Sequence, residues 1–407
     1  MTIKPDTSRT GPAASISAGL ILLLALLTAL DAMAIDMYLP AMPTIAGEFD
    51  AGAGRIQQTL SIFLAGLAIG QALYGPLLDR YGRRLPLLAG LVLFVLGSIL
   101  AAMAGSIESL LAARLLQALG AAGGLVTPRA IVADRCSMSE SSRIFSLLMQ
   151  VMMIAPILAP LIGGYLLGHG GWRFIFWTLA GLGVLGLGWC LLSLPDSLPV
   201  ERRVPISPGN VLRAYTRQMA SPVFLAYTLA GGFILGSLFL YISGSAFVFT
   251  RYFTLTPAQF SYLFAANSVG LVLGGQLGNQ LLKRGVRPQR TMFLGIALHG
   301  LAGLALFVAV ATGTAGLWTY VALLALAIAA LGLVFGNLTA LTMASAGRQA
   351  GVASALMGTL HYLLSAVIGY VASLTAQGPA LLPLAIALCA LAAAMLCLSA
   401  ARLGTPR

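Results

Sequence analysis

The stretch Gly75-Pro76-Leu77-Leu78-Asp79-Arg80-Tyr81-Gly82-Arg83-Arg84 separates two long apolar runs of the chain. Its glycines, Gly75 and Gly82, permit a tight reversal between two helices. The stretch also holds one acid followed by three arginines, which at a membrane surface can form a charge network with a neighbouring helix end. We therefore predict two antiparallel membrane helices joined by a charged loop, and build the rest of the fold outward from this pair.

Apolar runs of similar length fill the chain on both sides of the loop. Of the 407 residues, 59% are hydrophobic and 8% are charged, whereas a soluble domain is about 25% charged. A helix needs about 20 apolar residues to cross a bilayer, and the first run is too long to be a removable signal peptide. We predict twelve spans, at 16–40, 56–78, 85–105, 108–132, 142–168, 172–194, 222–243, 259–282, 289–312, 316–341, 350–374 and 380–401.

The second half of the chain repeats the first. A shift of 203 residues places Gly75 on Gly278 and Gly82 on Gly285, again between two apolar runs. It also places Arg80 on Lys283 and Arg84 on Arg287, while Leu282 stands where the first copy has Asp79. Parallel repeats of this kind occur in transporters. We predict an all-α membrane protein with a tail at 1–15, a six-helix bundle at 16–194, a linker at 195–221, a second six-helix bundle at 222–401 and a tail at 402–407.

The basic residues gather on one side of the predicted membrane. The net charge is +12, yet only Arg55, Arg173 and Arg251 fall on the opposite side, and Arg114 lies inside a span. The positive-inside rule then makes both termini cytoplasmic. The basic face would contact anionic lipid headgroups rather than nucleic acid. The four cysteines show no metal-binding spacing, so we expect neither a metal nor a cofactor.

Two aspartates, Asp31 and Asp36, lie inside the first apolar run. A carboxylate at bilayer depth costs roughly 2.5–3.5 kcal/mol, so it is kept where it faces a protein interior or a water-filled cavity. Burial favours the neutral form of a carboxyl group and a nearby arginine favours the ionised form. We expect the two acids to couple proton movement to conformational change. The alternative for Asp36 is that it ends the helix just before Pro40.

Arg114 is predicted to be the partner of Asp36. It lies about six residues inside its span, too deep for a cation without a counter-charge. The first span runs outward and the fourth inward, which brings Asp36 and Arg114 to similar depth. The alternative is that the long Arg114 side chain reaches the outer surface and forms no pair.

A second charged cluster is predicted at the cytoplasmic ends of the helices. Asp134 closes the fourth span and should lie near Asp79, Arg83 and Arg84. We expect these residues to form a latch that holds the two bundles together on the inside. Helix capping by Asp134 is the alternative, although an acid at a helix C-terminus has the wrong sign for the helix dipole.

The second half carries no acid at all after Glu201, so proton chemistry must lie in the first half unless a histidine provides it. Of the two histidines there, we expect His299 to be a packing residue, whereas His361 could be either a packing or a site residue. The remaining polar, aromatic and methionine side chains on the spans are candidates for the wall of a substrate cavity. They are Tyr38, Gln117, Met149, Met153, Tyr241, Asn267, Asn337, His361 and Tyr362.

Three motifs resemble those of a known transporter family. The loop Gly75–Arg84 resembles the signature loop of the major facilitator superfamily, with Arg84 in place of its final lysine. The fifth span resembles the motif of the antiporter branch through Pro156, Pro160, Gly163 and Gly164, with Ala159 in place of its first glycine. The run 35–43 resembles the bicyclomycin and chloramphenicol/florfenicol resistance (Bcr/CflA) group of drug/proton antiporters.

The resemblance implies a bacterial inner-membrane protein that exports small, largely apolar drugs in exchange for protons. It also implies a monomer that needs no cofactor besides the proton. A proton-coupled importer of a sugar, amino acid or peptide would use the same fold and remains the main alternative. A membrane enzyme is less favoured because the chain lacks a zinc-protease helix, a nucleophile elbow and a P-loop. A channel is disfavoured because no ring of charges and no carbonyl-filter sequence is visible.

Overall fold

The computed structural model describes residues 17–136, 138–198, 201, 203, 208–346, 350–375 and 378–403. The predicted tail 1–15 lies outside the described residues, as does most of the tail 402–407. The first half contains α1 (Ala18–Asp36), η1 (Leu39–Ala41), α2 (Met42–Glu48), α3 (Ala53–Tyr81), α4 (Arg84–Ala102), α5 (Ile107–Arg135) and α6 (Met138–Ser193). The remainder contains α7 (Pro208–Met219), α8 (Pro222–Phe247), the π-helix η3 (Val248–Tyr252), α9 (Pro257–Lys283), α10 (Pro288–Ala311), α11 (Leu317–Ala344), α12 (Ala350–Ser373) and α13 (Leu381–Leu403).

The twelve predicted crossings are confirmed, although two of them run together in α6. Within the described residues, 11 helices are long and apolar enough to cross a membrane. α6 has 56 residues and contains Gly171 at φ 72° and ψ 179°, which is not helical geometry. A straight helix of that length would measure about 84 Å, far more than the hydrocarbon core of about 30 Å. The chain therefore crosses twice within α6 and turns back at Gly171.

The predicted repeat appears in the backbone geometry of the two loops that follow α3 and α9. Gly82 and Gly285 both have a φ of 84°, a value that glycine adopts without the steric cost of a Cβ. The charged loop and its copy 203 residues later thus turn the chain in the same way.

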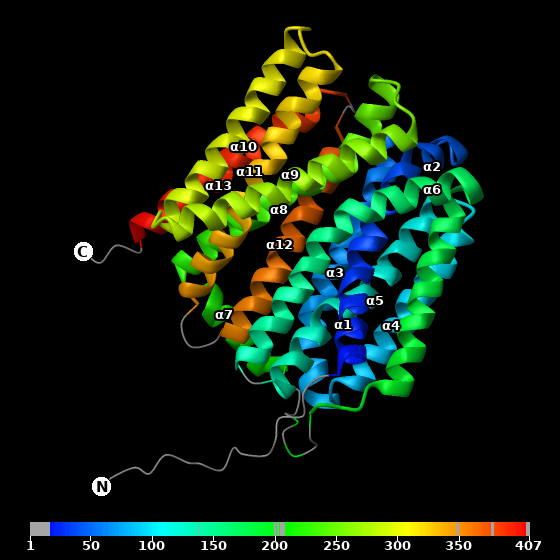
Figure 1. Cartoon of the computed structure of the whole chain (residues 1–407), viewed down its shortest axis with the longest axis vertical. Helices are drawn as coiled ribbons and strands as arrows, with labels where there is room; N and C mark the ends of the chain where they lie inside the picture. Colours follow the sequence, from blue (N-terminus) through cyan, green and yellow to red (C-terminus); the bar gives the residue numbers. More distant parts are fainter. Residues whose placement is uncertain are drawn as a thin grey trace.

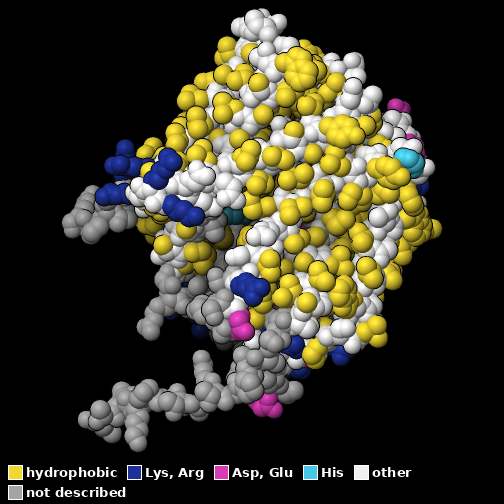
Figure 2. Space-filling view, viewed as in Figure 1, with side chains coloured by type: hydrophobic (Ala, Val, Ile, Leu, Met, Phe, Trp, Pro, Cys, Tyr) yellow, Lys and Arg dark blue, Asp and Glu magenta, His cyan; other side chains and the backbone are white. Residues whose placement is uncertain are grey.

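The helices form two groups that meet along their length. Figure 1 shows α1 and α3–α6 on one side, α8–α11 and α13 on the other, and α12 running beside α3. α12 packs against both α3 and α8, and α6 packs against α9. α7 lies within the predicted linker and contacts α8 and α12. The surface in Figure 2 is largely hydrophobic, and most of the Lys and Arg side chains in this view lie at its left and lower edges.

The first predicted span differs from the observed one at its end. α1 ends at Asp36, and the chain continues through η1 and the short helix α2, with Pro40 and Pro43 near their starts. A proline cannot donate the backbone hydrogen bond that would continue a helix, but it is tolerated in a first helical turn. The short helices η1 and α2 therefore cap the end of the bundle that lies opposite the charged loop. η1 contacts α8 and α9, so the two groups of helices touch at this end.

Candidate functional site

The two aspartates of α1 are enclosed by protein. Asp31 is 3% exposed and Asp36 is 4% exposed. The Oδ1 atom of each has no hydrogen-bond partner in the part of the chain that the structure describes. Asp36 is the last residue of α1, at the negative end of the helix dipole, where an ionised acid is disfavoured. The alternative prediction is confirmed as far as position goes, because α1 ends at Asp36. The carboxylate does not stabilise that helix end, however, so capping gives it no role there.

Asp31 interacts electrostatically with groups from both halves of the chain. Arg129 of α5 acts on Asp31, and both of these charges act on Tyr362 of α12. The positive-inside pattern predicts Arg129 among the cytoplasmic basic residues, and this interaction with Asp31 was not predicted. The position of Arg129 in the sequence was the signal for this interaction, because Arg129 lies six residues before Arg135, the last residue of α5. A long side chain can span that depth.

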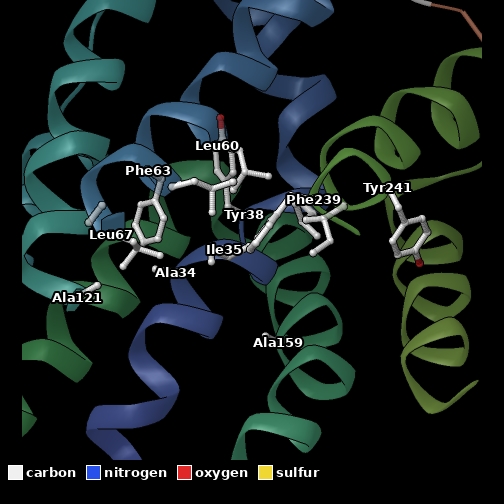
Figure 3. Close-up of a cluster of buried hydrophobic side chains, with 14 of the residues drawn as sticks. Ala34, Ile35, Tyr38, Leu60, Phe63, Leu67, Ala121, Ala159, Phe239 and Tyr241 are labelled. Atoms are coloured by element: carbon white, nitrogen blue, oxygen red, sulfur yellow. The ribbon is translucent and has the colours of Figure 1, made fainter. Parts of the chain in front are cut away.

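Arg114 is completely buried and is surrounded by aromatic rings. It donates to the Ala34 carbonyl oxygen at 3.0 Å and to Gln117 Oε1 at 2.6 Å. Its guanidinium carbon lies 4.2 Å from the ring centre of Phe63 and 4.9 Å from that of Tyr38. Figure 3 shows Tyr38 and Phe63 close together beside the end of α1. Ring faces carry negative charge density and stabilise a buried cation.

The predicted pair between Asp36 and Arg114 is wrong for this conformation. Both residues are described, and no ion pair joins them. Arg114 meets α1 at the carbonyl of Ala34, and side chains two residues apart point about 200° apart around a helix. Asp36 instead interacts electrostatically with Asp31 and with Tyr241 of α8. The alternative of a surface-reaching Arg114 is also wrong, because the side chain is 0% exposed.

Gln117 and Tyr38 support the buried arginine. Gln117 accepts from Arg114 and donates from Nε2 to Ser98 Oγ of α4 at 2.8 Å. The Tyr38 hydroxyl bonds Thr59 Oγ1 of α3 at 2.8 Å. Both residues were predicted to line a cavity, but both are fully buried around Arg114. In this conformation they orient the arginine rather than offer a free surface.

The cavity candidates of the second half fall into separate places. Asn267 Nδ2 donates to the Tyr241 hydroxyl at 3.1 Å, which joins two predicted residues from α9 and α8. Asn337 donates at 2.8 Å to a carbonyl of its own helix, that of Leu333. The ring of His361 packs against Gly231 of α8, where a Cβ would collide with it. Its buried Nε2 atom has no hydrogen-bond partner among the described residues, so both predicted roles, packing and site, stay predictions.

Two methionines and one tyrosine complete the predicted cavity set. Met149 and Met153 lie on α6 and are 54% and 37% exposed. Tyr362 lies 6.2 Å from the ring centre of Phe239, in addition to its interaction with Asp31. The set therefore contains free apolar side chains on α6 and aromatic side chains on α8 and α12.

The proline and glycine residues of α6 allow close contact with two other helices. Gly163 packs against the Met37 carbonyl at the end of α1, and Gly164 packs against Ser261 of α9. Pro160 has no N–H group, so the carbonyl of Pro156 cannot receive its helical hydrogen bond. Ser268 Oγ of α9 donates to that carbonyl at 3.2 Å. The gap left by the proline is thus filled from the other half of the chain.

The predicted latch forms, but within the first half and the start of the linker. Arg83 bonds Asp134 through Nε at 2.8 Å and Asp79 through Nη1 at 2.7 Å. The backbone N–H of Arg83 donates to Asp196 Oδ1 at 2.8 Å. Burial lowers the pKa of the Arg83 guanidinium, but the bonds and charges of Asp134 and Asp79 outweigh it and raise the pKa above its ordinary value. Among the described residues, the network reaches no helix of the second half.

Two other residues of the loop bind outside this network. Arg84 Nη2 donates to the Leu191 carbonyl at the end of α6 at 2.8 Å. Arg80 lies over the ring of the adjacent Tyr81, 5.3 Å from its centre. The loop therefore ties α3, α5, α6 and the linker to one another. The expectation that it joins the two bundles directly is wrong for the described residues, because the bonds of Arg83 and Arg84 lead to α3, α5, α6 and the linker.

Comparison with protein families matches residues 24–370, most of the chain, to the Major Facilitator Superfamily. The chain belongs to this superfamily. It is therefore a transporter rather than an enzyme, and a multi-pass protein of the bacterial inner membrane.

Several curated relatives are similar over most of their length. The chain is 36% identical to the uncharacterized MFS-type transporter YdgK of Bacillus subtilis (85% of this chain, 86% of the relative). It is 27% identical to a bicyclomycin resistance protein homolog of Haemophilus influenzae (86% and 87%). It is 32% identical to a chloramphenicol resistance protein of Pseudomonas aeruginosa (71% and 68%). The predicted resemblance to the drug-resistance group of the superfamily is confirmed.

Among solved structures, the fold is similar to that of the xylose transporter XylE from E. coli in a partially occluded inward-open conformation. The TM-score is 0.73 at 13% sequence identity, over 95% of this chain and 97% of the other. A sequence identity this low supports the shared fold alone. The predicted major facilitator fold is thus confirmed by both the sequence family and the structure.

Proposed function

We propose that this transporter exports small, largely apolar drugs from the cytoplasm in exchange for protons, with both termini in the cytoplasm. The observation that carries the proposal is the pair of enclosed acids on α1. Asp31 and Asp36 are the two carboxylates that are buried in the described part of the chain. The names of the relatives, which refer to bicyclomycin and chloramphenicol resistance, support drugs as the exported class.

Asp31 is positioned to link protonation to the arrangement of the two halves. When ionised it attracts Arg129 of its own half, and its charge also acts on Tyr362 of α12. When protonated it loses that attraction. A proton can shift a conformational equilibrium if the two arrangements bind it with different affinity. The charge of Asp31 acts on one group of each half, so a change in how the halves pack would change its affinity for a proton.

Asp36 lies at a second contact between the halves. Its charge acts on Tyr241 of α8, which is bonded to Asn267 of α9. Gly163 of α6 packs against the neighbouring residue, Met37. A change in the charge of Asp36 would therefore act on side chains of both halves, which alternating access moves relative to each other. Arg114 contributes by holding the end of α1 through the Ala34 carbonyl.

Four of the predicted cavity side chains suit an apolar ligand. Met149 and Met153 present flexible, polarizable surfaces on α6. Tyr241 and Tyr362 supply ring faces from the second half, with a small number of polar atoms. Pockets for small molecules are mostly apolar with few polar groups. We propose that these four residues contact the drug during export.

Alternating access requires contacts that break as one end opens. At the end opposite the charged loop, Gln58 Nε2 of α3 donates to Ser373 Oγ of α12 at 3.1 Å. A Cβ at Gly54 of α3 would collide with the backbone of Ser373. Opening that end would break both contacts. We propose that this structure represents the arrangement in which the outer end is closed.

The proposal is tested in inside-out membrane vesicles with an acidified interior and a pH-sensitive dye inside. Adding a phenicol should alkalinise the interior, because drug enters as protons leave. Asp36→Asn should abolish the response and Asp31→Asn should reduce it. Asp50→Asn is the matched control, since Asp50 is an exposed acid at φ 48°, a conformation that Asn tolerates.

Two results would contradict the proposal. A proton-coupled importer would move drug and proton in the same direction, so the external drug would not accumulate in vesicles with an acid interior. The double variant Asp31→Asn, Asp36→Asn should have no proton-driven drug movement. If it still moved drug against a gradient with protons in return, the proton site would lie elsewhere, with His361 the next candidate.

A further inference from the structure

A groove on the membrane-facing surface separates the two halves on the side of α3 and α12. It has a volume of about 440 Å³ and is walled by α3, α5 and α12. The residues that line it are Arg55, Gln58, Ser61, Ile62, Ala65, Leu111, Leu363, Ala366, Val367 and Tyr370. None of these residues belongs to the proton or drug site proposed above.

The groove is polar at one end and apolar along the rest of its length. Arg55, Gln58 and Ser61 lie toward the start of α3, whereas Ala65 lies deeper along the helix. On the opposite wall, Leu363 and Val367 are large hydrophobic side chains that remain exposed. The polar end lies at the end of the bundle away from the charged loop. Its pattern matches a molecule with a polar head and an apolar tail.

The length of the groove matches one leaflet of the bilayer. Arg55 and Ala65 are ten residues apart on α3, which is about 15 Å along a helix. The hydrocarbon core is about 30 Å thick, so one leaflet is about half of that. A lipid tail that starts at Arg55 would therefore end near Ala65, at the middle of the membrane.

The polar end carries two opposite charges that remain accessible. Arg55 Nη2 bonds Glu108 Oε1 at 2.9 Å, and their side chains are 48% and 67% exposed. Arg55 Nη1 also donates to Gln58 Oε1 at 2.8 Å. A phosphate could bind the arginine, and an ammonium group could bind the carboxylate. A purely anionic head would be repelled by Glu108, which selects for a head group with both charges.

We propose that this groove binds one zwitterionic phospholipid whose head group carries a primary ammonium. The phosphate binds Arg55, the ammonium donates to Glu108, and one acyl chain lies along Ala65 and Leu363. A choline head cannot donate an N–H bond to Glu108, so it binds more weakly. The groove has walls from both halves, beside the Gln58–Ser373 bond. The bound lipid thus favours the arrangement in which this end is closed.

The test measures lipid binding to the purified full chain by native mass spectrometry, independently of transport. Phosphatidylethanolamine, phosphatidylcholine and phosphatidylglycerol with the same acyl chains are titrated. We expect the first phosphatidylethanolamine to bind about tenfold more tightly than phosphatidylcholine, the effect of one charge-assisted hydrogen bond. Equal binding of the two, or preference for phosphatidylglycerol, overturns the proposal.

Variants locate the binding at the groove. Arg55→Gln with Glu108→Gln should abolish the preference for phosphatidylethanolamine. The control, Glu48→Gln with Arg173→Gln, removes another exposed ion pair at the same end and should keep it. Persistence of the preference in the first double variant overturns the proposal, as does its loss in the control.

A second pair of variants tests the apolar part of the groove. Ala65→Trp fills the groove and should weaken binding of both phosphatidylethanolamine and phosphatidylcholine. Leu96→Trp changes an exposed position on α4 outside the groove and should have no effect. Unchanged binding in Ala65→Trp places the lipid elsewhere. Circular dichroism and thermal unfolding check that each variant is folded.

Discussion

The hydrogen bond from Ser268 of α9 to the Pro156 carbonyl of α6 joins the two halves of the transporter. It lies where one backbone hydrogen bond of α6 is missing. The carbonyl lacks its usual helical donor because residue 160 is proline. Ser268 Oγ fills the gap at 3.2 Å and also lies 3.0 Å from the Phe264 carbonyl of its own helix. We predict that Ser268→Ala weakens the contact between α6 and α9 and shifts the transporter toward arrangements in which they separate.

The size of the shift follows from the geometry. A neutral hydrogen bond contributes about 1 kcal/mol net, and a buried carbonyl left without a donor costs about 1–3 kcal/mol. Ser268 divides its one proton between two acceptors, so the lower figure applies. About 1 kcal/mol corresponds to a change of about fivefold in an equilibrium constant. The separated population should therefore rise about fivefold relative to the closed one.

Spin labels on the two halves measure this ratio through pulsed electron-spin distances. Met103 at the end of α4 and Ala311 at the end of α10 are both exposed and lie at the same end of the bundle. Each is replaced by cysteine and labelled. Cys136, which is half-buried, is replaced by serine, and the other three cysteines are buried. The long-distance fraction should increase in Ser268→Ala.

Two further variants make the prediction specific to the gap. Ser399 lies on α13 and donates to the Leu396 carbonyl of its own helix at 2.7 Å, so Ser399→Ala should leave the distances unchanged. Pro160→Ala returns an N–H group to the Pro156 carbonyl, and Ser268→Ala should then add no further shift. The reasoning is refuted if Ser268→Ala acts equally strongly with Pro160 or Ala at that position, or if it has no effect at all.

Three other predictions concern the loop, the topology and the buried arginine. Asp134→Asn should lower the unfolding temperature more than Asp79→Asn, because the Asp134 side chain is 19% exposed and that of Asp79 is 61% exposed, and exposed ion pairs contribute only about 0.2–1 kcal/mol. Asp79→Asn should slow export yet keep equilibrium drug binding, because it weakens the hold on Arg83, which bonds the linker between the two halves. Full export activity in Asp79→Asn would show that this network plays no part in transport. A cysteine in place of Arg251 should react with an impermeant reagent from outside, and a cysteine in place of Arg203 should not. The reverse result would show that the predicted orientation in the membrane is wrong. Arg114→Lys should reduce uphill export at least about tenfold at equal protein level. Lysine cannot keep both the ring stacking and the two hydrogen bonds of the arginine. Normal export in this variant would show that a positive charge alone is sufficient at this position.

The sequence by itself was enough to predict the architecture. Crossings follow from the length of apolar runs, which is a local property set by the thickness of the bilayer. The turn after α3 and its copy after α9 follow from Gly82 and Gly285, whose geometry depends on the residue itself. The two acids of α1 could be singled out for the same reason, since a carboxylate in an apolar run is costly wherever the helix packs.

The partners of the site residues depended on the tertiary structure. Whether Arg114 meets Asp36 or the Ala34 carbonyl depends on how α1 is rotated about its axis, and one residue changes that direction by about 100°. The interaction of Asp31 with Arg129 and the bond of Ser268 to Pro156 depend on the tilt and depth of helices far apart in the chain. Hydrophobic pattern determines that a helix crosses the membrane, but it leaves rotation, tilt and depth to the packing of neighbouring helices.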